Sequence, residues 1–158
     1  MTYTEQMQKI WTAYENAGMS LPATSRAVAA WAISQGLWKP HPEDILTKCA
    51  DDLSVALRAE YRTDAFGRRY RSKHAVRLVS AGIQQTFWAD IDKAPRSHMQ
   101  IAFAQRRKQI VGDCHQLKTD VDYYNNVHPN EKPIQLVLDF TADVMEIEAL
   151  DARNTVAA

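Results

Sequence analysis

The stretch "GRRYRSKHAVRLVSAGIQQTFW", residues 67–88, decides the predicted fold, because its basic and apolar residues alternate. The basic positions share one parity and are Arg69, Arg71, Lys73 and Arg77. The apolar and aromatic positions share the other parity and are Tyr70, His74, Val76 and Leu78. Successive side chains of a β-strand point to opposite faces, so the spacing predicts a strand with one basic and one apolar face.

A turn at Ala81 and Gly82 would fold this strand back and give one β-hairpin over about 69–91. With Leu78 opposite Gln85, the expected cross-strand pairs are Val76–Phe87, Lys73–Asp90 and Arg71–Asp92. The two aspartates would lower the positive charge of the basic face. A hairpin face of solvated ion pairs is therefore an alternative to a binding face.

Three helices are predicted before the hairpin, at about 3–17, 23–35 and 42–60. The first is expected to end at Gly18, and the second to end at Gly36. The third is expected to start near Pro42, with Glu43 and Asp44 in its first turn. Its predicted buried stripe consists of Leu46, Cys49, Leu53 and Leu57. Three helices followed by a hairpin is the order of a winged helix-turn-helix, so residues 1–92 are predicted to form a winged-helix-like domain.

The C-terminal part, residues 93–158, is predicted to be a helical extension. Apolar residues three and four apart predict a long helix over roughly 94–125, with a stripe of Met99, Phe103, Ile110, Cys114, Leu117, Val121 and Tyr124. An acidic amphipathic helix is expected after Pro133, although "IQLVLDF", residues 134–140, also fits a strand. The last residues, "ARNTVAA", are expected to fray. The fold class is thus mainly α with one β-hairpin, and the length of the stripe predicts a homo-oligomer, most simply a homodimer.

The net charge is zero, but the charges are segregated along the chain. Residues 62–118 carry 12 basic and 4 acidic side chains, a balance of +8, whereas residues 119–158 carry 2 and 8, a balance of −6. A local positive field attracts phosphates even when the whole molecule is neutral. The alternative is that the acidic C-terminal segment folds back and neutralises the basic middle.

Nucleic acid, with double-stranded DNA as the expected form, is the predicted partner of the basic residues, as in a transcriptional regulator. The candidate contact residues are Arg68, Arg69, Arg71, Lys73, Arg77, Lys39, Lys48, Arg106, Arg107 and Lys108. The wing is favoured over the third helix as the contact element, because four carboxylates on that helix would repel phosphates. The alternative function is a protein-interaction adaptor that makes no nucleic-acid contact.

Enzyme signatures are sparse. The sequence has no Gly-rich phosphate loop, Cys-x-x-Cys pair or Gly-x-Ser-x-Gly elbow, so we expect no cofactor, no metal and no enzymatic activity. The spacing of Arg69 and His74 is similar to that of helical ribonucleases of the HEPN type, which leaves a nuclease as a third hypothesis. Strand parity, however, places this pair on opposite faces.

Two runs of sequence resemble those of small bacterial and mobile-element proteins. The first is Asp-x-x-Gly-Arg-x-x-Arg-x-Lys-His-Ala, from Asp64 to Ala75, and the second is Ile-Val-Gly-Asp-Cys at 110–114. The resemblance covers most of the chain and implies a winged-helix-like region, but it carries no activity. The sequence shows neither a signal peptide nor a membrane span, so a cytoplasmic location is expected.

Overall fold

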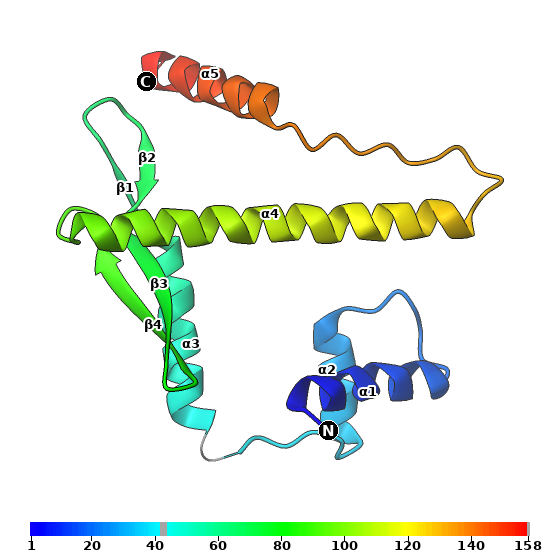
Figure 1. Ribbon diagram of the computed structural model, residues 1–158. Coiled ribbons are helices and arrows are strands. Elements are labelled where there is room, and N and C mark those ends of the chain that lie inside the picture. The colour runs from blue at the N-terminus through cyan, green and yellow to red at the C-terminus, as the bar shows by residue number, and fades with distance from the viewer. Residues whose placement is uncertain (42–43, 158) are drawn as a thin grey trace. The chain divides into compact units, whose positions relative to one another are not determined.

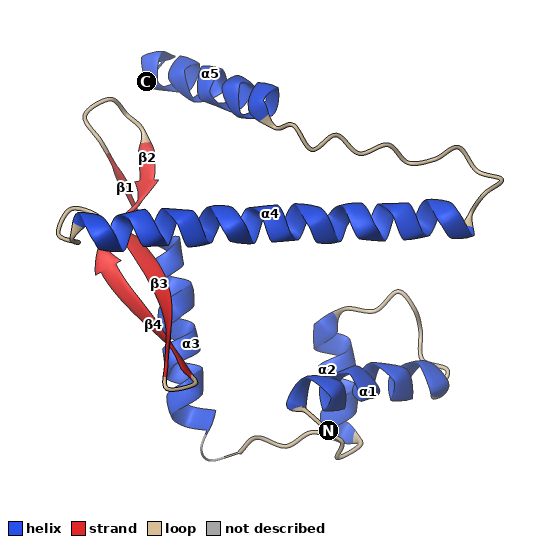
Figure 2. Ribbon diagram, viewed as in Figure 1, coloured by secondary structure: helices blue, strands red, loops and turns tan. Residues whose placement is uncertain are grey.

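The computed structural model describes residues 1–41 and 44–157, which are mainly helical with two antiparallel strand pairs (Figures 1 and 2). This confirms the fold class of mainly α with a hairpin and adds a second strand pair. Contacts divide the chain into two compact units, Met1–Asp51 and Asp52–Ala158. The hairpin therefore shares a unit with the long C-terminal helices. The division predicted after residue 92 is a different one, and whether ranges 1–92 and 93–158 fold separately stays a prediction.

The first unit is built on α1 (Tyr3–Asn16) and α2 (Ser25–Ser34), at the positions predicted. Thr2 and Glu5 form a reciprocal capping box at the start of α1, which satisfies two backbone N–H groups that the helix leaves unpaired. The small core consists of Ile10, Tyr14, Val28 and Ala32, with Trp31 and Trp38 packed against it. The apolar residues of the two helices therefore face each other.

Helix α3 (Asp44–Ala59) crosses the boundary between the two units. The predicted start at Pro42 and Glu43 lies outside the described residues. The predicted buried stripe is wrong, because no residue of α3 is buried: Leu46 is 80% exposed and Leu53 57% exposed, and Cys49 is also exposed. Amphipathic spacing shows what a helix could bury, not whether a partner covers it.

The central hairpin consists of β3 (Lys73–Ser80) and β4 (Ile83–Asp90). Leu78 pairs with Gln85, Val76 with Phe87 and Lys73 with Asp90, so the predicted register is confirmed. Ala81 and Gly82 both have positive φ, as a tight hairpin turn requires. The expected alternation holds from Lys73 to Arg77, where His74 and Val76 are buried and their neighbours are not.

The predicted continuation of this strand through Arg69 and Arg71 is wrong. Arg69 and Arg71 belong to a separate strand, β2 (Arg69–Arg71), which pairs with β1 (Tyr61–Thr63), so Arg71 lies opposite Tyr61 and not Asp92. Ser72 explains the break, since it is fully buried and both its N–H (3.1 Å) and its hydroxyl (3.3 Å) donate to the carbonyl of Glu60. These two bonds fix a corner between β2 and β3.

The long helix α4 (Arg96–Val127) packs against β3, and Figure 1 shows the hairpin extending from the N-terminal part of this helix. Of the stripe predicted on α4, Phe103 is 49% and Ile110 51% exposed, and Ala102 is the one buried residue of the helix. Within the described residues, no helix has the length and apolar character needed to cross a bilayer.

The acidic helix expected after Pro133 is present, but it starts later than predicted, and the alternative strand at 134–140 is absent. Residues 128–140 form neither helix nor strand, and α5 (Thr141–Ala157) starts only after them. The side chain of Asn125 accepts from the N–H of Ile134 (2.9 Å) and donates to its carbonyl (3.0 Å), and so occupies the main-chain groups that a helix or strand would use. The predicted fraying of "ARNTVAA" is wrong for residues 152–157, which are helical, and Ala158 lies outside the described residues.

Candidate nucleic-acid interface

A concave site of about 400 Å³ lies within the second unit, between the hairpin, the end of β2, the C-terminal end of α3 and one face of α4. We call it the basic groove. Its cationic lining consists of Arg58, Arg71, Lys73, Arg77, Arg106 and Lys108. The remaining lining is uncharged or aromatic and consists of His74, Ala75, Trp88, Ala102, Gln105 and Gln109. Among the described residues, no carboxylate lines the groove.

One face of α4 holds β3 in place and so sets the shape of the groove. The side-chain amide of Gln105 accepts from the N–H of Arg77 and donates to its carbonyl, both at 2.8 Å. Two helical turns earlier, a ring nitrogen of His98 lies 2.9 Å from the carbonyl of His74. Buried Ala102 lies between them in the sequence. These bonds fix the strand that carries Arg77 against the helix that carries Arg106.

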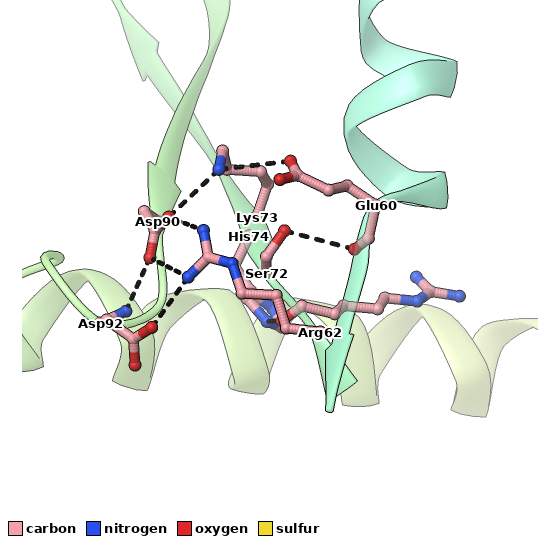
Figure 3. A network of polar contacts seen from close by, with 8 residues as sticks. Glu60, Arg62, Ser72, Lys73, His74, Asp90 and Asp92 are labelled. Atoms are coloured by element: carbon pink, nitrogen blue, oxygen red, sulfur yellow. Dashed lines mark hydrogen bonds and ion pairs between the residues drawn. The ribbon is translucent and has the colours of Figure 1, made fainter. Parts of the chain in front are cut away.

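Lys73 is neutralised from within the protein, as Figure 3 shows. Its ammonium nitrogen lies 3.1 Å from a carboxylate oxygen of Asp90 and 3.2 Å from one of Glu60. The hydrogen bond that Lys73 donates to Asp90, and then the one that it donates to Glu60, raise the pKa of Lys73 above its usual value. The predicted cross-strand pair with Asp90 is therefore present, and Lys73 contributes little free positive charge to the groove.

Arg62 completes this network from β1. It forms a hydrogen-bonded ion pair with Asp90 and a second ion pair, at 2.8 Å, with Asp92. The Arg62 guanidinium, with further bonds from the Asp92 N–H and Lys73, holds the pKa of Asp90 well below its usual range. The network joins β1 to both strands of the hairpin, and it pairs Asp92 with Arg62 where the sequence had predicted Arg71.

The other five cations of the groove have no carboxylate partner among the described residues. They are Arg58, Arg71, Arg77, Arg106 and Lys108. The guanidinium of Arg58 lies 5.3 Å from the ring centroid of Trp88, and Nε of Arg71 donates to the hydroxyl of Tyr61 at 3.3 Å. That bond, together with nearby positive charge, lowers the pKa of Tyr61. The groove thus concentrates uncompensated positive charge.

Several predicted contact residues lie outside the groove lining. Arg68 forms an ion pair with Asp64 at 2.6 Å. The guanidinium of Arg69 lies 4.1 Å from the ring centroid of Tyr61. Arg107 is exposed on α4, but the groove is lined by its two sequence neighbours instead. The remaining two, Lys39 and Lys48, lie in the unit Met1–Asp51.

The Arg69 and His74 pair is not arranged as a catalytic pair. His74 is 8% exposed, one ring nitrogen lies 2.9 Å from the carbonyl of Arg71, and its ring meets that of Phe103 edge-on. Arg69 lies on another strand and stacks on Tyr61. Within residues 1–41 and 44–157, no three His, Cys, Asp or Glu side chains gather as a possible metal site.

Sequence reasoning missed Arg58, Trp88, Gln105 and Gln109 as parts of this site. The signal for Trp88 was present, because the predicted register already places it opposite Ala75, on the face that carries Lys73 and Arg77. Gln105 and Gln109 flank the basic run 106–108 and are one helical turn apart. No comparable signal identified Arg58, since its role depends on where α3 ends.

The acidic helix α5 does not neutralise the groove by ion pairing, because none of the described ion pairs includes a carboxylate from this helix.

Comparison with protein-family models, with curated proteins and with solved structures found no match to this chain.

Proposed function

We propose that this protein binds nucleic acid, with the basic groove as the site that holds the phosphate backbone. The observation that carries the proposal is the groove itself: six cationic side chains line it, and five of them have no carboxylate partner among the described residues. Arginine is well suited to phosphate because its planar guanidinium can form two parallel hydrogen bonds.

The proposal narrows the set of contact residues given by the sequence. The contacts assigned to phosphate are Arg58, Arg71, Arg77, Arg106 and Lys108, which line the groove and lack carboxylate partners. Lys73 instead supports the site by joining Glu60 to the hairpin. The order of three helices and a ribbon also supports a winged-helix-like region with the β3–β4 ribbon as its wing, and the proposed function implies a cytoplasmic location.

Charge-matched variants test the proposal. Replacing Arg71, Arg77 and Arg106 together by alanine removes three charges from the groove, whereas replacing Arg68, Arg107 and Lys118 removes three charges from outside it. We expect the first variant to lose most of its affinity for a labelled oligonucleotide in fluorescence anisotropy at low salt, and the second to keep it. Equal losses of affinity in the two variants would mean that binding depends only on the net charge of the protein, and would refute the groove as the site.

A protein-interaction adaptor is the second candidate, and exposed apolar side chains favour it. Residues 134–140 include five apolar side chains that are at least a third exposed, namely Ile134, Leu136, Val137, Leu138 and Phe140. Exposed apolar surface of this kind is typical of binding sites for other proteins. Failure to bind any oligonucleotide at low salt, together with a stable complex with another protein, would favour this function.

We also propose that the long helix pairs with a second copy of the chain. The predicted stripe of α4 is largely uncovered, with Phe103, Ile110, Leu117 and Tyr124 each more than 40% exposed. Light scattering should then give about twice the mass of one chain, and replacing Phe103 and Ile110 by serine should shift the mass toward that of one chain. A single-chain mass for the unaltered protein would refute this pairing.

A further inference from the structure

The basic groove contains one large aromatic ring, and its position bears on the form of nucleic acid that fits. Trp88 comes from β4, lies opposite Ala75 in the register, and is half-buried in the groove lining. The Arg58 guanidinium lies over the indole ring, 5.3 Å from its centroid. An aromatic ring among cations is the combination that binds single strands, because bases stack on the ring while the cations hold the backbone.

The size and concave shape of the groove also favour an unpaired nucleotide. Its volume of about 400 Å³ falls in the range of pockets that enclose a small molecule. In a duplex the base faces are stacked on one another, and proteins reach only the base edges through the grooves. A ring in a small hollow can therefore stack on a base only when that base is unpaired.

The polar lining gives such a base a further partner. Gln105 has both its amide oxygen and its amide nitrogen bonded to the main chain of Arg77, so it serves as a support. Gln109, one helical turn further on, lines the same groove, and its side-chain amide has no hydrogen bond to another described residue. Its amide carries both donors and an acceptor, as the edge of an unpaired base requires.

From these observations we propose that the basic groove binds single-stranded nucleic acid in preference to duplex. An unpaired base stacks on Trp88, and its flanking phosphates lie against Arg71, Arg77 and Arg106. This rests on the proposed function, since it specifies the form of nucleic acid that the same groove takes. The chemistry is common to DNA and RNA, and the test below includes both.

Tryptophan fluorescence of the whole protein tests the stacking directly. Three of the four tryptophans, Trp11, Trp31 and Trp38, lie in the unit Met1–Asp51, so Trp88 is the one reporter in the other unit. Short thymidine and uridine oligomers should quench the emission of the unaltered protein. The quench should vanish in Trp88→Phe, which keeps a ring for stacking, and persist in the matched control Trp11→Phe.

Affinity and salt dependence separate stacking from charge. Trp88→Ala should weaken single-strand binding by about 5- to 150-fold, the loss expected for one stacked base, and should leave the slope of log affinity against log salt unchanged. A duplex of the same length should bind more weakly than the single strand at equal salt. Circular dichroism of both Trp88 variants checks that they fold. If Trp88→Ala does not fold, the quenching measured in Trp88→Phe still tests the inference.

The outcomes distinguish this inference from the proposed function. If duplex binds as tightly as single strand, or if quenching survives in Trp88→Phe, the single-strand inference is overturned while nucleic-acid binding by the groove stands. If neither form binds the unaltered protein at low salt, the proposed function falls and the inference falls with it. If only the thymidine or only the uridine oligomer binds with quenching, the inference holds for DNA or for RNA alone.

Discussion

Replacing Arg106 by alanine should reduce the salt dependence of nucleic-acid binding, whereas replacing its neighbour Arg107 should not. Both are exposed arginines on α4, but only Arg106 lines the basic groove. Each phosphate contact to a single strand contributes about 0.7 to the slope of log affinity against log salt. Five groove cations without carboxylate partners then give a slope of about −3.5, and Arg106→Ala lowers its magnitude to about 2.8.

These slopes predict effects that are easy to measure. Between about 50 and 200 mM salt, the unaltered protein should lose affinity by about 130-fold and Arg106→Ala by only about 50-fold. Fluorescence anisotropy with one labelled oligomer over that salt range gives both values, and Arg107→Ala should match the unaltered protein. The same change in slope for both variants, or no change for Arg106→Ala, would refute the assignment of contacts from the groove lining.

Three further predictions follow from the polar network and from the turn at Gly67. Lys73→Met should lower the magnitude of the salt slope by less than about 0.7, the change expected when one phosphate contact is lost, because Asp90 already compensates the charge of Lys73. A decrease of about 0.7 in anisotropy titrations would contradict this. The pKa of Asp90 is lowered in the folded state, so its stabilising effect is present above the unfolded pKa of about 3.9 and is lost as the pH falls further. The melting temperature of Asp90→Asn should therefore fall less at acid pH than that of the unaltered protein. The same fall in both proteins would count against the network. Gly67 has a φ of 79°, and a methyl group there would meet Cγ2 of Thr155 at 2.6 Å, so Gly67→Ala should destabilise the fold by about 1–3 kcal/mol in denaturant unfolding; an unchanged midpoint would show that neither the strain nor the contact matters.

Local patterns along the sequence were sufficient to predict the hairpin. The parity of His74 and Val76, together with the turn at Ala81 and Gly82, led to the observed register, including the pair of Lys73 with Asp90. The break at Ser72 was not predictable in the same way, because alternation continues through it in the sequence. It depends on two bonds to Glu60, a residue twelve positions earlier whose proximity only the tertiary fold creates.

The candidate site was predictable in its charge but not in its composition. A run of basic residues identified Arg71, Arg77 and Arg106, yet nothing in a single sequence tells which of two adjacent arginines, 106 or 107, faces a groove. Helical faces are decided by packing, here by the bonds from Gln105 to the main chain of β3. For the same reason the apolar stripe of α3 predicted a core that its neighbours do not provide.

Photochemical crosslinking tests most directly whether nucleic acid occupies the basic groove. A single-stranded oligomer that carries iodouracil reacts on illumination with aromatic side chains close to the base, and peptide mapping then locates the attachment. We predict attachment to the peptide that contains Trp88, and its loss when Arg71, Arg77 and Arg106 are replaced together by alanine. Attachment confined to residues 1–51, or undiminished in that triple variant, would contradict the account.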